Sequence, residues 1–198
     1  MFNFSPGVKL PFPERMREEY QVFDNRILLN LSFEKIGPLL HDFTAMLDEP
    51  LFLVFTEPLT QGEEKDFRKN DTDFFHRGIY YLDGLSKEQV FELLQKYEEV
   101  LLNDGLSEFG VASHTSGEEL FIQKYKTISI YTKDFEKYKA LLRRYDIPET
   151  SNILTPRATF SAETPGEAFR LTTDGIDVYD VQEELTKLGM YRAKVIIG

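Results

Sequence analysis

The most informative stretch of the chain is residues 86–131, which read SKEQVFELLQKYEEVLLNDGLSEFGVASHTSGEELFIQKYKTISIY. Ser86, followed by Gln89 three residues later, has the capping-box pattern that is typical of a helix start. Apolar residues then recur at helical spacing as far as Leu101, with charged residues between them. Asn103-Asp104-Gly105 supplies the glycine that commonly follows a last helical turn. This pattern predicts an amphipathic helix over residues 86–103.

The second half of the same stretch has the composition of strands. β-branched and aromatic residues gather in segments 108–114, 120–122 and 127–131, and the first two segments are separated by the turn residues Thr115-Ser116-Gly117. A helix with one apolar stripe next to strands with one apolar face indicates a layer of helices on a sheet.

Residues 32–55 repeat the order of helix, turn and strand. We expect a helix over 32–47, with its regular part beginning near Pro38 because proline removes a hydrogen bond deeper in a helix. The apolar run Leu51–Phe55 predicts a central strand buried on both faces. The similarity between 32–55 and 86–111 suggests duplicated helix–strand units.

The rest of the chain supplies further elements of both kinds. The expected elements are a short helix over 14–23, strands over 26–29 and 78–82, a helix over 134–145, a hairpin around Asp174-Gly175, a helix that begins with a capping box at Asp180 and Glu183, and a last strand over 191–197. Because the strands come in adjacent runs, the predicted class is α+β, with a mainly antiparallel sheet and helices on one face.

Length and composition limit the class of protein. A chain of 198 residues favours one domain over 1–198, and the Pro/Thr-rich segment 148–166 is the only candidate boundary. The absence of cysteine excludes disulfides, thiolate metal sites and a cysteine nucleophile. Residues 1–7 lack the pattern of a signal peptide, and no apolar run approaches the ~20 residues of a membrane span. We therefore expect a soluble, cytoplasmic protein with no membrane partner.

The charge balance bears on possible partners. The chain has 34 acidic and 23 basic residues, which gives a formal net charge of −11. A negative surface repels phosphate backbones, so we expect no nucleic-acid partner. The same charge complements a basic protein.

Catalytic and cofactor motifs are missing from the sequence. It has no G-x-x-x-x-G-K-[ST], no G-x-G-x-x-G and no G-x-S-x-G, so we assign no catalytic residue and no cofactor. The chain has three histidines, no two of which have i, i+4 spacing, and the sequence predicts no metal site. One alternative remains, a small enzyme with an Asp/Glu/His site near His114. Its site would consist of His76, His114, Glu118 and Glu119.

A polar segment over 61–75 is the best candidate for a binding surface. It combines aromatic and acidic residues, which suit anchoring to a basic partner. The predicted partner-binding residues are Phe67, Phe74, Phe75, Asp66, Asp71 and Asp73. The structural alternative is that Phe74 and Phe75 tuck under the loop and fix it to the core.

These observations favour a non-enzymatic protein-binding module with a basic partner. A specific version is an immunity-type protein that neutralises a cationic toxin such as a nuclease. A further alternative, a homo-oligomeric structural protein, would show a large apolar patch. The sequence leaves the oligomeric state open.

Overall fold

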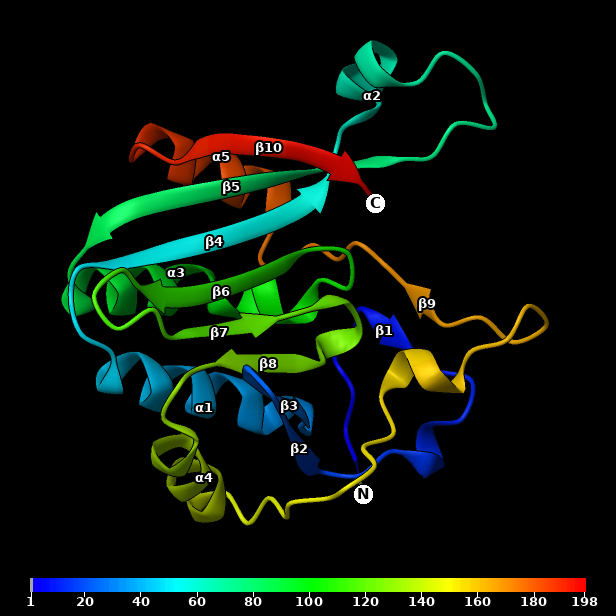
Figure 1. The fold of residues 1–198 in the computed structure, drawn as a ribbon. Coiled ribbons are helices and arrows are strands. Elements are labelled where there is room, and N and C mark those ends of the chain that lie inside the picture. Colours follow the sequence, from blue (N-terminus) through cyan, green and yellow to red (C-terminus); the bar gives the residue numbers. More distant parts are fainter. Residues whose placement is uncertain (1) are drawn as a thin grey trace.

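A computed structural model describes residues 2–198 and contains an eight-stranded sheet in the order β10-β5-β4-β6-β7-β8-β3-β2 (Figure 1). Every neighbouring pair in this sheet is antiparallel. The strands are β2 (Glu19–Phe23), β3 (Arg26–Asn30), β4 (Leu51–Pro58), β5 (His76–Leu85), β6 (Glu108–Ser113), β7 (Glu119–Ile122), β8 (Ile128–Tyr131) and β10 (Tyr191–Ile197). A small second sheet joins β1 (Val8–Lys9) to β9 (Glu167–Ala168). The predicted α+β class with an antiparallel sheet is confirmed.

Within residues 2–198, four α-helices cover one face of the sheet and a fifth projects from its end (Figure 1). The covering helices are α1 (Phe33–Met46), α3 (Lys87–Asn103), α4 (Phe135–Arg144) and α5 (Val178–Lys187), and the projecting helix is α2 (Gln61–Phe67). Short 3-10 turns are η1 (Pro13–Arg15), η2 (Lys124–Lys126) and η3 (Pro156–Thr159). Within residues 2–198, no helix is long and apolar enough to cross a bilayer.

The core lies between the helices and alternate residues of the strands. Leu51, Leu53 and Phe55 of β4 point to this side and are buried with Leu94 and Tyr97 of α3. The Ser86 capping box forms as predicted, with the Gln89 N–H donating to Ser86 Oγ over 3.2 Å. Burial of these two stripes against each other is what holds the helix layer on the sheet.

The opposite face of β4 is only partly buried. Val54 is buried there, but Phe52 is half-buried, because no helix of the described chain covers this face (Figure 1). The expectation of a strand buried on both faces therefore holds at Val54 and fails at Phe52.

The two helix–strand units suggested by the sequence lie next to each other. Helix α1 packs against α3, and β4 pairs with β6 so that Phe55 lies opposite Phe109. The two helix–strand units of the sequence are therefore neighbours in both the helix layer and the sheet.

Several predicted elements differ in the structure. Residues 14–23 do not form a helix, because Tyr20 and Val22 alternate toward the core as part of strand β2. Helix α1 begins at Phe33 rather than near Pro38, and the exposed Pro38 lies inside it.

The third difference concerns α5, which begins at Val178. The Asp177 carboxylate accepts hydrogen bonds from the N–H groups of Tyr179 and Asp180, so the helix cap lies three residues before the predicted one. Asp174 and Gly175 form a turn closed by a bridge between Thr173 and Ile176, and the flanking segments do not extend into hairpin strands.

The two edge strands of the sheet, β2 and β10, differ in their backbone hydrogen bonding. The outer side of β2 is paired with the segment after α4: Tyr20 N–H donates to the Pro148 carbonyl over 3.0 Å, and Thr150 N–H donates to the Tyr20 carbonyl over 2.8 Å. Strand β10 has β5 on one side only among the described residues, and its register shifts between Arg192 and Lys194.

Three distant segments meet behind the end of α3. Gly105 N–H donates to the Phe169 carbonyl, and Phe169 N–H donates to the Gly7 carbonyl, each over 2.8 Å. A Cβ on Gly105 would overlap the Gly7 carbonyl oxygen. Glycine is required here because two backbones are in direct contact.

Candidate functional site

Residues 60–75 form an arm made of α2 and the loop that leads to β5 (Figure 1). Thr60 and Glu63 make a capping box, in which the Glu63 carboxylate accepts from Thr60 N–H over 3.0 Å. This T-x-x-E signal is visible in the sequence, and it explains why the first half of the predicted loop is helical.

The aromatic residues predicted for partner binding are exposed on this arm. Phe67, Phe74 and Phe75 are 41%, 72% and 64% exposed. The alternative in which Phe74 and Phe75 are fixed to the core is therefore wrong. The Phe75 ring is instead covered by the Arg68 guanidinium, 4.0 Å from the ring centre.

The acidic residues of the arm have different roles. Asp73 accepts hydrogen bonds from Lys69 N–H and Asn70 N–H over 2.8 and 3.0 Å, and these bonds lower the pKa of its carboxyl group. Asp73 therefore shapes the loop, whereas Asp66 and Asp71 are exposed. Lys65, Arg68 and Lys69 lie among them, so the arm is aromatic without being strongly acidic.

We expect the variant with Phe74→Ala and Phe75→Ala to keep the stability of the parent protein. Exposed side chains contribute little to folding, so the free energy of unfolding should change by less than about 1 kcal/mol. Urea denaturation followed by circular dichroism measures this. Cooperative unfolding at a much lower urea concentration would mean that the rings are part of the core after all.

The residues of the alternative enzyme site do not come together. His76 begins β5 and its Nδ1 lies 3.0 Å from Glu64 Oε2, while His114 follows the far end of β6 and its Nε2 lies 3.1 Å from Asp83 Oδ1. Along the sheet, Arg77 lies opposite Pro58 and Ser113 lies opposite Leu51, at the other end of β4.

The two glutamates of that alternative site point to opposite sides of the sheet. Glu118 pairs with Lys137 over 2.8 Å, and Glu119 lies on the uncovered face, where burial raises its pKa. Among residues 2–198, no group of three or more His, Asp or Glu side chains is arranged to hold a metal ion.

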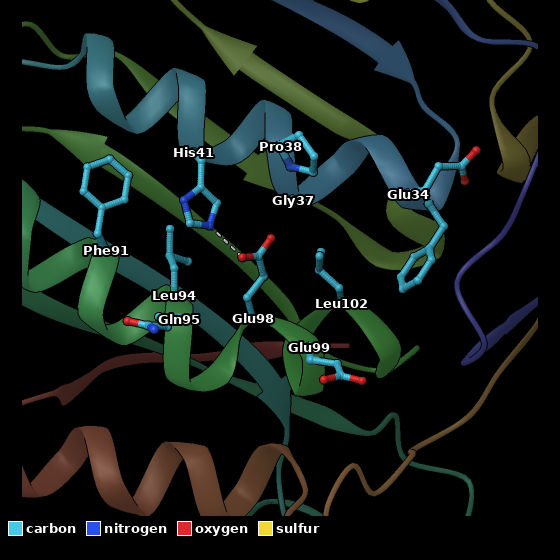
Figure 2. A pocket seen from close by; sticks show the side chains of 11 residues that line it. Glu34, Gly37, Pro38, His41, Phe91, Leu94, Gln95, Glu98, Glu99 and Leu102 are labelled. Carbon is cyan, nitrogen blue, oxygen red and sulfur yellow. Dashed lines mark hydrogen bonds and ion pairs between the residues drawn. The ribbon is translucent and has the colours of Figure 1, made fainter.

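A groove between α1 and α3 is a candidate site that sequence reasoning missed (Figure 2). Its volume is about 650 Å³. His41 Nε2 lies 2.7 Å from Glu98 Oε2 inside it, and the His41 ring stacks on Phe91 with 5.5 Å between ring centres. A Cβ on Gly37 would overlap the Glu98 carboxylate, so this glycine lets the carboxylate lie against α1.

The groove combines an apolar floor with an acidic rim. The apolar lining residues are Phe33, Pro38, Phe91, Leu94 and Leu102, and the carboxylates are Glu34, Glu98 and Glu99 (Figure 2). None of the described lining residues is Lys or Arg. The groove therefore suits an apolar group with positive charges beside it.

Comparison of the chain with protein-family models, curated proteins and solved structures finds no match.

Proposed function

We propose that this protein is a non-enzymatic binding module that holds a basic amphipathic segment of another protein in the groove between α1 and α3. The supporting observation is the apolar floor bordered by Glu34, Glu98 and Glu99, with no Lys or Arg among the described lining residues. Helices commonly bind in this way, with apolar side chains at i, i+3, i+4 and i+7 in a groove. The net charge of −11 increases the rate at which a cationic partner arrives.

The groove suits this role better than the aromatic arm. Its volume lies within the range of about 300–1,000 Å³ that is typical of ligand pockets, and it accepts several large side chains. On the arm, by contrast, Asp73 bonds to its own loop and Lys69 is a neighbour. The arm is the alternative surface for contact with the same kind of partner, a basic segment of another protein.

An immunity-type protein is the specific version of this proposal. A toxin that acts on nucleic acid presents a cationic surface, and an acidic module that covers this surface blocks access of the substrate. The acidic groove and the overall negative charge support this version.

The test is binding of a fluorescent helical peptide of about 15 residues, with Leu at i, i+3, i+4 and i+7 and Lys elsewhere. The control peptide has the same composition in scrambled order. We expect the variant with Glu98→Gln and Glu99→Gln to bind the amphipathic peptide roughly tenfold more weakly than the parent, measured by fluorescence anisotropy at low salt.

The matched control is the variant with Glu88→Gln and Glu92→Gln, which removes two charges from α3 outside the groove. It should lose much less affinity than the variant with Glu98→Gln and Glu99→Gln, because charges farther from the bound peptide interact with it more weakly. Equal losses in both variants, or equal binding of the scrambled peptide, would contradict a groove-specific site. A loss that occurs only when Phe74 and Phe75 are replaced would move the site to the arm.

Gly37→Ala tests the groove without changing its charge. The methyl group displaces the Glu98 carboxylate, which lies at the end of a flexible side chain, so the fold tolerates it. Alanine also favours a helix over glycine by roughly 0.5–1 kcal/mol. We expect unchanged or slightly higher stability together with a several-fold loss of peptide affinity. Gly62→Ala in α2 is the control, and it should leave peptide affinity unchanged.

A further inference from the structure

A small polar pocket lies on the uncovered side of the sheet, where η2 and η3 approach β3 and β6. Its volume is about 240 Å³. Its cationic side chains are Arg26, Lys124 and Arg157, and its neutral polar side chains are Gln123, Thr127 and Thr155. Three positive charges in one pocket stand out in a chain with a net charge of −11.

The positive charge of this pocket is not balanced within the described chain. Among the described lining residues, Glu108 is the only carboxylate. It already accepts a hydrogen bond from Lys124 N–H over 2.8 Å and lies 3.6 Å from the Arg77 guanidinium. Within residues 2–198, Arg26, Lys124 and Arg157 make no ion pair of 4.0 Å or less.

The excess of positive charge in the pocket affects the pKa of Lys124. Burial lowers the pKa of its ammonium group, and the neighbouring charges of Arg77 and Arg157 lower it further. An anion placed between these groups would relieve their repulsion.

We propose that this pocket binds the phosphate group of a small molecule. A phosphate offers several oxygens to the charged donors of Lys124 and Arg157, and threonine hydroxyls complete such sites. The volume is below the usual ~300–1,000 Å³ of ligand pockets, which suits one phosphate and a few attached atoms. A polyanion such as nucleic acid is disfavoured by the charge of the whole chain.

This pocket is independent of the groove between α1 and α3. Arg26 lies opposite Tyr131 and Glu108 lies opposite Thr56, and all of these residues alternate with the core residues of their strands. The pocket is therefore on the other side of the sheet from α1 and α3.

The experiment is a titration of the ¹⁵N-labelled full chain with inorganic phosphate, with ionic strength held constant by sodium chloride. We expect saturable shifts of the amide signals of Lys124, Thr127 and Thr155. The variant with Lys124→Gln and Arg157→Gln should bind at least about tenfold more weakly, because each charged hydrogen bond is worth roughly that factor. Lys133→Gln, an exposed change outside the pocket, is the control and should bind as the parent does.

Three outcomes would overturn the proposal. They are shifts that do not saturate, shifts that persist unchanged in the double variant, and equal responses to acetate and phosphate at the same ionic strength. Because Arg157 is exposed, Arg157→Gln alone keeps the fold and carries the test if the double variant does not fold.

Discussion

Glu57→Gln is expected to gain stability relative to the parent protein as the pH rises from about 5 to about 9. The difference in the free energy of unfolding should grow by about 1.4 kcal/mol for each pH unit. Glu57 is the next-to-last residue of β4 and is 2% exposed, and its Oε2 has no hydrogen-bond partner in the described chain. Burial raises the pKa of its carboxyl group to about 9, although the nearby charge of Arg170 opposes the shift.

The sign follows from the number of bound protons. Between the ordinary pKa of 4.5 and the folded value of about 9, the folded state keeps the Glu57 proton and the unfolded state has lost it. The stability of the parent protein therefore falls as the pH rises through this window. Glutamine does not titrate, so the variant does not lose stability in this way. The free energy of unfolding of the variant therefore rises relative to that of the parent by about 3 kcal/mol between pH 5 and pH 7.

Urea denaturation at several pH values measures this effect. Glu88→Gln, an exposed change on α3, is the control and should follow the parent at every pH. A constant difference in the free energy of unfolding between Glu57→Gln and the parent would show that Glu57 titrates at an ordinary pH.

Gly105→Ala is expected to lower the free energy of unfolding by about 3 kcal/mol, near the upper end of the usual cost of overpacking. The new methyl group would overlap the Gly7 carbonyl and crowd Phe169 N–H, and both are backbone atoms. To make room, the first segment must move away, which weakens the hydrogen bond from Phe169 N–H to Gly7 and the bond from Ser5 Oγ to the Leu102 carbonyl.

Gly62→Ala is again the suitable control, because its new methyl group meets open space apart from the Thr60 hydroxyl at 3.9 Å. It should be neutral or slightly stabilising in the same urea experiment. A loss of under about 0.5 kcal/mol in Gly105→Ala, which is ordinary for a surface change, would show that the three segments separate at little cost.

The capping box at the start of α3 was read correctly from the sequence, whereas the capping box of α2 was missed and its residues were expected to form a loop. Ser86 and Gln89 define the start of α3 because a capping box acts over a few residues. The predicted glycine stop is wrong: Asp104 ends the helix in an extended conformation, and Gly105 does not have a positive φ. Residues 19–23 were misassigned because five residues carry a weak pattern, and their pairing with β3 decides their structure. At α5, the sequence contains two overlapping capping boxes, one that starts at Asp177 and one that starts at Asp180. The earlier one forms because it allows Val178 to pack in the core.

Candidate sites were harder to predict than elements. The sequence singled out Phe74 and Phe75 because they interrupt a long charged segment, but it left open whether the rings are exposed or tucked under the loop. The groove could not, because His41 and Glu98 are separated by 57 positions and meet only when α1 packs on α3. The pocket around Lys124 likewise depends on the approach of 155–157, a segment with no regular pattern.

Because its two edge strands differ, the sheet is open to an added strand mainly at one edge. On β2, the outer N–H and C=O of Tyr20 are already bonded to residues 148 and 150, so a strand from another molecule adds more readily beside β10. There, the register shift and the charges of Arg192 and Lys194 interrupt the flat ladder that templated aggregation requires. Arg192 forms an ion pair with Glu63 over 2.6 Å, and Lys194 adds a further charge, so this edge strand is charged rather than apolar. Charged side chains on an edge strand oppose pairing between copies, which favours separate molecules over fibres.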